Sequence, residues 1–229
     1  MATMKYEDDR STSSLSALVR RLIVAAFGLF IFTFGIYVTL RANIGVGPWD
    51  VLSMGIEKQT VFSFGESALI VSATILILDL LLKEKIGPGT VLDVIITGKG
   101  VDLFLAWDPL PLQTTIYGGV AFILLGLTLM AIGQRIYMPQ ALGMGPRDLL
   151  MVALGKRVRN IPIGLVLTVI LGLVILSGWL LGGSVGLGTL VSLIAAGPIM
   201  QMIFAIKRFD PRNVSHDTFA VFKRVLAKR

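Results

Sequence analysis

Two copies of a short Gly-x-Gly-Pro-x-Asp element contain the residue types best suited to chemistry in this chain. In each copy the glycines permit a tight turn, the proline suits the first position of a helix, and the aspartate falls in the first helical turn. Two such helix starts can offer backbone N–H groups to an anion, or their carboxylates can bind a cation or a proton. The alternative is a purely structural turn. The residues are Gly45, Gly47, Pro48 and Asp50 in the first copy, and Gly143, Gly145, Pro146 and Asp148 in the second.

A second candidate site is formed by three ionisable residues inside one apolar segment, 88–107. They are Asp93, Lys99 and Asp102. A charge at the bilayer centre costs about 2.5–3.5 kcal/mol on insertion scales, so such side chains face a protein interior or a wet cavity and are paired. Lys99 and Asp102 are three positions apart, so an ion pair between them is the alternative to a binding role. Asp93 can share a polar stripe with Thr97.

The elements that must hold these residues are membrane-spanning helices. The 229 residues are 55% hydrophobic and only 15% charged, with a mean hydropathy of +0.82, whereas a soluble domain has roughly 25% charged residues. A spanning helix needs about 20 apolar residues. Six segments qualify, so we expect an all-α polytopic membrane protein with six transmembrane helices at 22–40, 64–82, 88–107, 114–134, 162–181 and 186–206.

An internal repeat extends well beyond the Gly-x-Gly-Pro element. Three spans per half is an odd number, so the second half must enter the membrane from the side opposite to the first. We therefore expect two inverted three-helix repeats, each with a short interfacial or re-entrant helix after its Gly-x-Gly-Pro turn. The matching pairs, 98 or 99 positions apart, are Gly28/Gly126, Gly35/Gly133, Gly87/Gly186, Gly89/Gly188, Thr90/Thr189 and Gly98/Gly197.

The repeats define the expected domain organisation. Residues 1–19 form a disordered cytoplasmic tail, 20–108 the first membrane repeat and 112–206 the second, and 207–229 a basic amphipathic cytoplasmic tail. Within the third span of each repeat, the small residues at Gly98–Gly100 and the Gly197–Pro198 pair predict a kink or an unwound turn at the same depth. Close helix packing is the alternative role of these glycines.

The positions of the charges predict the topology. Placing both termini in the cytoplasm puts most of the 21 basic residues on the inner side, as the positive-inside rule requires. The net charge of +7 therefore describes orientation on anionic lipid rather than a nucleic-acid partner. Other polar and aromatic residues receive interfacial roles: an ion pair of Asp79 with Lys83, a solvated Glu66, and membrane-surface anchors at Trp49, Trp107 and Trp179.

The chain lacks the residues that several classes of chemistry require. The chain has no cysteine, which excludes a thiolate nucleophile and a Cys-ligated metal, and its one histidine, His216, leaves little room for a Ser-His-Asp triad. We expect no enzyme activity, no metal and no cofactor. The expected partners are the lipid bilayer and a small-molecule or ion substrate, and a homodimer is left open.

These motifs also resemble a known family. The Gly-x-Gly-Pro-Trp-Asp element after the first span, a Gly-x-Gly-Thr at the start of the third span and a second Gly-x-Gly-Pro copy are similar to the YczE/YyaS/YitT group of bacterial integral membrane proteins, over residues 20–206. The resemblance implies a multi-span fold in the bacterial inner membrane and transfers no substrate. We expect a small-solute secondary transporter or permease with its site between the repeats. The alternative is a non-transporting scaffold that regulates a cytoplasmic partner.

Overall fold

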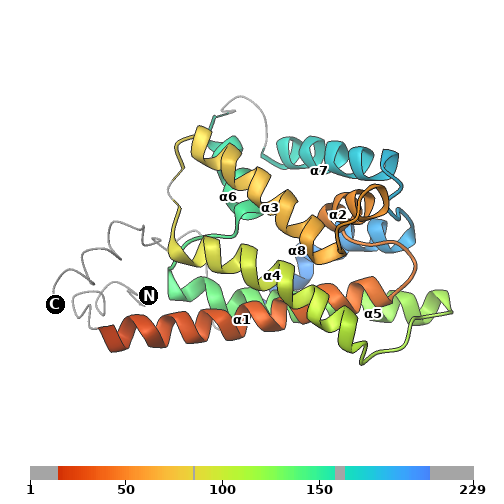
Figure 1. The fold of residues 1–229 in the computed structure, drawn as a ribbon, viewed down its shortest axis with the longest axis horizontal. Coiled ribbons are helices and arrows are strands. Elements are labelled where there is room, and N and C mark those ends of the chain that lie inside the picture. Colours follow the sequence, from red (N-terminus) through yellow and green to blue (C-terminus); the bar gives the residue numbers. More distant parts are fainter. Residues whose placement is uncertain (1–14, 85, 158–162, 207–229) are drawn as a thin grey trace.

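Every regular element is a helix in the computed structural model, which describes residues 15–84, 86–157 and 163–206 (Figure 1). The all-helical prediction is thus confirmed for this part of the chain. The helices are α1 (Leu15–Arg41), α2 (Pro48–Gln59), α3 (Phe64–Leu81), α4 (Pro88–Trp107), α5 (Ile116–Tyr137), the 3₁₀ helix η1 (Met138–Gln140), α6 (Pro146–Arg157), α7 (Ile163–Leu180) and α8 (Leu187–Ala205).

Four of these helices, α1, α3, α5 and α8, are long and apolar enough to cross a membrane. Helix α4 has 20 residues but carries the three charged side chains named above. Helix α7 contains the apolar stretch Thr168–Leu180. Large apolar side chains cover the outer surface, as lipid contact requires, and examples are Ile23, Phe27, Ile77, Leu173 and Ile194. The chain is a helical membrane protein.

The helix bounds agree closely with the six predicted segments, with one difference at the N-terminus. Helix α1 begins at Leu15, so the last residues of the predicted tail, 15–19, are helical. Residues 1–14 and the predicted basic tail, 207–229, lie outside the described residues.

Two helices, α2 and α6, are too short to cross the membrane. Each has 12 residues and begins at the proline of its Gly-x-Gly-Pro element. The preceding glycines, Gly45 and Gly143, have φ angles of +102° and +125°, a left-handed conformation that glycine adopts without steric cost. The prediction of a short helix after each turn is confirmed.

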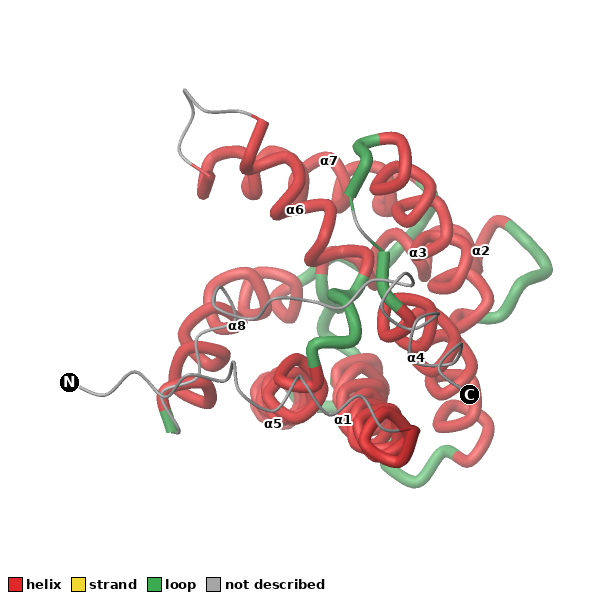
Figure 2. Tube along the Cα trace, turned by 90° about the vertical axis from the view of Figure 1, so that its left-hand side faces the viewer, coloured by secondary structure: helices red, strands yellow, loops and turns green. Residues whose placement is uncertain are grey.

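Helices α1 and α5 lie side by side in both views of the molecule (Figures 1 and 2). Glycines bring their backbones together: a Cβ atom on Gly28 would lie 2.9 Å from the carbonyl oxygen of Gly133, and one on Gly35 would lie 2.7 Å from that of Gly126. The first glycine of one helix thus meets the second glycine of the other, so the two helices run antiparallel.

Each Gly-x-Gly-Pro element docks on the Gly-x-Gly-Thr element of the other half. The amide of Gly188 donates to the carbonyl of Ile44, and the amide of Gly89 donates to the carbonyl of Leu142, both at 2.7 Å. In each case the acceptor directly precedes the positive-φ glycine. These two hydrogen bonds tie the halves together at equivalent points.

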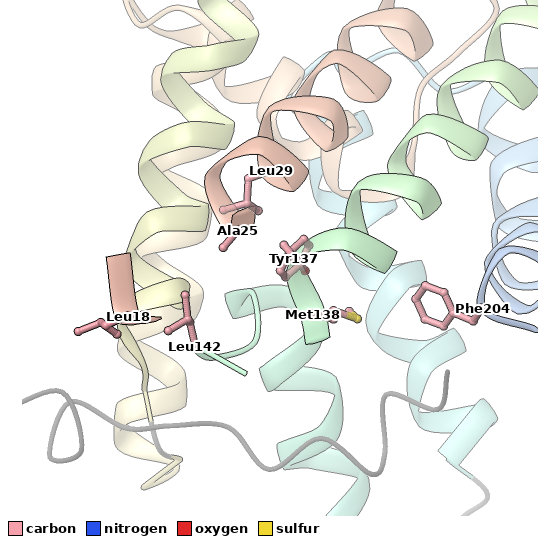
Figure 3. Close-up of a cluster of buried hydrophobic side chains, with 7 residues drawn as sticks. All are labelled: Leu18, Ala25, Leu29, Tyr137, Met138, Leu142 and Phe204. Carbon is pink, nitrogen blue, oxygen red and sulfur yellow. The ribbon is translucent and has the colours of Figure 1, made fainter. Parts of the chain in front are cut away.

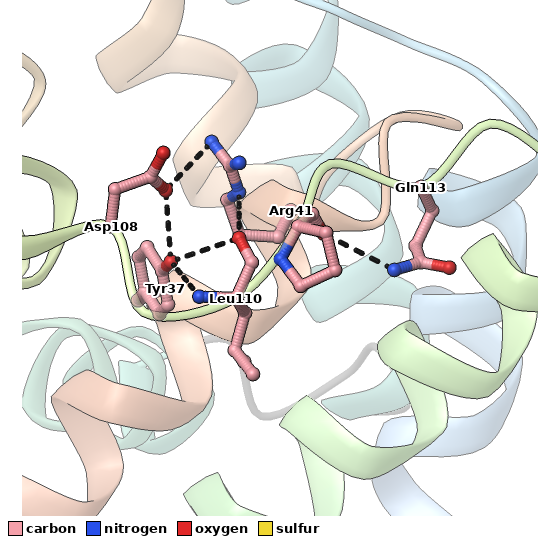
Figure 4. A network of polar contacts seen from close by, with 6 residues as sticks. Tyr37, Arg41, Asp108, Leu110 and Gln113 are labelled. Carbon is pink, nitrogen blue, oxygen red and sulfur yellow. Dashed lines mark hydrogen bonds and ion pairs between the residues drawn. The ribbon is translucent and has the colours of Figure 1, made fainter.

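The ends of the α1–α5 pair are held in different ways. At one end, an apolar cluster fills the space between α1, η1 and α8 (Figure 3). At the other end, Arg41 forms an ion pair with Asp108 at 3.0 Å and donates to the carbonyl of Leu110 at 2.9 Å. The hydroxyl of Tyr37 donates to Asp108 at 3.1 Å and accepts the Leu110 amide (Figure 4). This network fastens the α4–α5 connection to α1.

The helices expected to be the third span of each half, α4 and α8, are both continuous. Helix α4 is unbroken through Gly98–Gly100 and α8 through Pro198, so the expectation of an unwound turn is wrong. Gly98 serves packing instead, since a Cβ on it would lie 2.9 Å from the carbonyl oxygen of Gly65 on α3. Its counterpart Gly197 has no such neighbour within 4 Å, so the halves differ here.

Candidate functional site

The N-terminal ends of α2 and α6 meet inside the molecule. Nη1 of Arg147 lies 3.6 Å from Oδ1 of Asp50. The guanidinium carbon of the same arginine lies 5.6 Å from the centroid of the Trp49 ring, a cation–π distance. Trp49 and Arg147 occupy the same position in the two copies of the repeated element, so the copies face each other across this contact.

Two further carboxylates face the same arginine. Oγ1 of Thr97 donates to Oδ1 of Asp93 at 3.0 Å, as the predicted polar stripe requires. The phenol of Tyr137 interacts with the carboxylate of Asp148. Arg147 acts electrostatically on both carboxylates. We call Trp49, Asp50, Asp93, Arg147 and Asp148 the central cluster.

The glycines of the motif let the carboxylates approach the helix starts. A Cβ on Gly145 would lie only 2.6 Å from Oδ2 of Asp93, and one on Gly47 would lie 3.1 Å from Oδ2 of Asp50. Any larger residue at Gly145 would therefore displace Asp93. The carboxylate of Asp93, on α4, consequently lies at the positive end of the α6 dipole.

The remaining motif residues shape the turns. Gly45 packs against the second half, with an added Cβ 2.6 Å from the Gly186 nitrogen. Gly143 packs against the first half, with an added Cβ 2.6 Å from Thr90 Oγ1. Pro48 and Pro146 are the first residues of α2 and α6. These four residues hold the helix starts in place without offering a functional group.

The central cluster is partly shielded from solvent, with Asp50 buried and the other four residues half-buried, and its polar atoms are only partly satisfied. Asp50 is 5% exposed, and its Oδ1 has no hydrogen-bond donor. Nη2 of Arg147 has no acceptor, and the buried hydroxyl of Ser192, the counterpart of Asp93 in the second half, is also unpartnered. Buried polar atoms normally have partners. Three carboxylates around one guanidinium leave an excess of negative charge, which favours a proton or a cation as an additional partner.

Lys99 and Asp102 lie apart from the central cluster, and the ion pair expected between them is not formed. Lys99 pairs with Glu66 at 3.7 Å. Asp102 accepts hydrogen bonds from Oγ of Ser63, at 2.5 Å, and from the amide of Gly65, at 2.7 Å. Both side chains of α4 therefore contact α3, and Asp102 satisfies donors at the start of that helix.

Two glutamates lie near this contact, Glu66 in the first turn of α3 and Glu57 near the end of α2. Glu66 is not merely solvated, because it also accepts the Ser63 amide in a capping box. Burial raises the pKa of the Glu57 carboxyl at the end of α2, and the Asp102 carboxylate adds to the rise. We therefore assign Lys99 and Asp102 to the joint between α3 and α4 rather than to a ligand site.

Two other expectations are corrected by tertiary contacts. Asp79 is fully buried and neither of its carboxylate oxygens has a hydrogen-bond partner, so it does not form the interfacial pair expected with Lys83. Trp49 is part of the central cluster and is not a surface anchor. Trp107 and Trp179 are exposed, which is compatible with the anchoring role.

Three residues of the site were missed in the sequence: Trp49, Arg147 and Tyr137. A sign of the first two was present, because a tryptophan and an arginine stand at matching positions of otherwise similar elements. When two copies of an element face each other, residues at matching positions meet at the point where the copies are closest. Tyr137 at the end of α5 left no comparable sign, since its contact with Asp148 depends on the turn formed by η1.

Two surface grooves are lined mainly by apolar atoms. One, of about 500 Å³, lies at the start of α1, and the other, of about 250 Å³, lies along α7 next to Trp179. Neither is lined by a residue of the central cluster. Their apolar lining fits lipid chains.

The comparison with known proteins concerns nearly the whole membrane region. The family described as "Family of unknown function (DUF6198)" matches residues 19–205. The chain belongs to this family. Both copies of the Gly-x-Gly-Pro-x-Asp element, and the whole central cluster, lie within the part that matches DUF6198.

Relatives of this DUF6198 chain are similar over most of their length. An "Uncharacterized protein" of Haemophilus influenzae is 33% identical over 198 residues, which cover 86% of this chain and 88% of the relative. The "Uncharacterized membrane protein YczE" of Bacillus subtilis is 28% identical over 92% of this chain and 94% of its own. "Uncharacterized protein YyaS" of the same organism is 28% identical over 78% and 90%. The resemblance to the YczE group is thereby confirmed. No solved structure matches the chain.

Proposed function

We propose that this protein is a small-solute secondary transporter or permease whose site is the central cluster between the two halves. The observation that carries the proposal is the gathering of Asp50, Asp93, Asp148 and Arg147 at two facing helix starts inside an apolar helical protein. Ionisable residues are costly in a membrane interior and mark ion or substrate pathways. Short helices that begin near the middle of the membrane provide such sites in transporters built from repeats.

The contacts between the halves support an inverted-repeat architecture for this transporter. The glycine contacts of α1 with α5 are reciprocal, and so are the two hydrogen bonds that join each Gly-x-Gly-Pro turn to the opposite half. Reciprocal contacts of this kind are those that a two-fold axis generates. In this architecture α1, α3, α4, α5, α7 and α8 are the six spans, and α2 and α6 are re-entrant helices.

The charge of the central cluster favours a proton or a cation over an anion. Three carboxylates lie at or beside the helix starts, and one guanidinium opposes them. An anionic solute would have to displace carboxylates from the positive helix ends, whereas a cation or proton would relieve their mutual repulsion. We therefore assign proton or cation coupling to Asp93 and Asp148, with Arg147 as their internal counter-ion.

The orientation proposed for the transporter is that of a bacterial inner-membrane protein with both termini in the cytoplasm. Arg157 at the end of α6 pairs with Glu84 after α3 at 3.1 Å, so the end of α6 and the basic connection after α3 lie at the same end of the molecule. This common location supports their assignment to the cytoplasmic side.

Proteoliposomes loaded with a pH-sensitive dye test the function. After an external acid jump, with a panel of small cationic and zwitterionic solutes, we expect the purified protein to carry protons faster than empty liposomes for at least one solute. Asp93→Asn and Asp148→Asn should abolish this flux. Glu66→Gln, a carboxylate near the molecular surface, should retain it and serves as the matched control.

Two outcomes would overturn the proposal. One is wild-type flux equal to that of empty liposomes across the panel. The other is a cellular phenotype that survives Asp50→Asn, Asp93→Asn and Asp148→Asn but is lost on removal of residues 207–229, which would favour the scaffold.

A further inference from the structure

The carboxyl of Asp79 is buried on α3, and Asp79 is not a member of the central cluster. Asp79 is 0% exposed, and neither its Oδ1 nor its Oδ2 has a hydrogen-bond partner. It lies one turn after Ile75 on α3, and Ile75 packs with Leu150 of α6 in one apolar cluster. Asp79 therefore lies on the face of α3 that contacts α6.

The corresponding contact in the other half contains no carboxyl. The counterpart of Asp79, 99 positions later, is Gly178 on α7, and it packs directly on α2: an added Cβ would lie 2.5 Å from the Leu52 nitrogen. Gly55 of α2 meets the carbonyl of Gly178 in the same way. Two helices of this fold can thus pack at this position without an acidic group, so packing alone does not account for Asp79.

The charged groups around Asp79 do not neutralise it. Glu84, just beyond the end of α3, has the same sign and acts on Asp79 electrostatically. Among the described side chains at this end of α6, Arg157 is bound to Glu84, to the Ala153 carbonyl at 2.8 Å and to the Leu82 carbonyl. No hydrogen bond or ion pair reaches Asp79 from α2 or α4 within the described ranges. An ionised carboxylate in such a place would be uncompensated, and such groups take up a proton instead.

We propose that Asp79 is a proton-binding site. Its carboxyl carries a proton while α3 and α6 are packed together, and it releases the proton to water when that contact opens at the end marked by Arg157 and Glu84. Helix α6 carries Arg147 and Asp148 at its first turn and Arg157 at its last. Proton release from Asp79 is therefore coupled to the position of the helix that bears Arg147 and Asp148 of the central cluster.

Infrared spectroscopy of the purified full-length protein tests the assignment directly, because a protonated carboxyl has a carbonyl stretch that a carboxylate lacks. At pH 7 we expect such a band in the wild type and in Glu66→Gln, a control at the other end of α3. Asp79→Asn should remove the component of this band that comes from Asp79, while any component from the central cluster stays, and Asp79→Glu, which keeps the carboxyl, should shift the Asp79 component. The Glu variant allows the band to be assigned if Asp79→Asn does not fold.

Stability gives a second readout with a defined sign. If the folded state holds one proton that the unfolded state has released, stability must fall as the pH rises, by up to tenfold in the unfolding constant per pH unit. We expect thermal unfolding of the wild type to show this fall between pH 5 and 7, and Asp79→Asn to reduce it. A band that neither Asp79 variant alters, or equal pH dependence in wild type and Asp79→Asn, would overturn the proposal. Neither readout uses transport, so this site can fail while the proposed function stands.

Discussion

The ion pair of Asp50 with Arg147 should provide a large and measurable coupling between the two helix starts. The charged atoms are 3.6 Å apart, and the side chains are 7% and 18% exposed. At an effective dielectric constant of about 20, two unit charges at that distance attract by about 4.6 kcal/mol. Removing one partner of a buried pair costs about 3–5 kcal/mol. We expect Arg147→Gln to lower the free energy of unfolding by an amount in this range, because Asp50 would be left unpaired.

A double-mutant cycle separates this coupling from the other effects of each substitution. The cycle comprises Asp50→Asn, Arg147→Gln and the double variant, followed by equilibrium unfolding in mixed micelles. We expect the double variant to be more stable than the sum of the single effects predicts, by at least about 2 kcal/mol.

An internal control is available at almost the same separation. Lys99 and Glu66 are 3.7 Å apart, but their side chains are 62% and 43% exposed, so water screens the attraction and we expect a coupling of about 1 kcal/mol or less. If the Asp50–Arg147 cycle is additive, or if its coupling does not exceed that of Lys99–Glu66, burial does not strengthen the pair and the cluster is not the low-dielectric site described above.

Two further predictions test the packing and the orientation. Gly35→Ala should destabilise the protein by about 1–3 kcal/mol, because its Cβ would lie 2.7 Å from the Gly126 carbonyl oxygen. Gly172→Ala should be neutral or mildly stabilising, because its Cβ would have no neighbour within 4 Å. Equal thermal unfolding temperatures for the two variants would contradict the close α1–α5 contact. The topology can be tested by cysteine labelling, because the chain has no cysteine of its own. Val61 is 97% exposed, so Val61→Cys should react with a membrane-impermeant maleimide on intact cells, whereas Lys83→Cys should react only after permeabilisation. The reverse labelling pattern would show that the topology is inverted.

Local sequence patterns predicted the helices well, because a helix start and the length of an apolar run depend on neighbouring residues. The prolines at positions 48, 88 and 146 each begin a helix, as their missing N–H and restricted φ favour. The repeat also identified the glycines at which helices touch. It did not reveal their partners, since Gly28 contacts Gly133 rather than its own counterpart.

The candidate site was only half predictable for the same reason. Asp50, Asp93 and Asp148 were found from spacing and burial cost, and the structure brings them to one arginine. Lys99 and Asp102 seemed to be one another's partners because helical spacing was the only neighbour relation available. Their true partners, Glu66 and the start of α3, are brought to them by packing of α3 on α4.

The sequence by itself determined that this is a helical membrane protein, where most of its helices begin and end, and that it contains two related halves. Those properties follow from hydropathy, from glycine and proline, and from regular spacing, all of which act over short stretches of chain. Only the tertiary structure decided that Trp49 and Arg147 meet, that Lys99 leaves the central cluster, and that Asp79 is buried without a partner. Each of these depends on which helices pack together, because the energy of a charge in a low-dielectric interior depends on the groups that surround it.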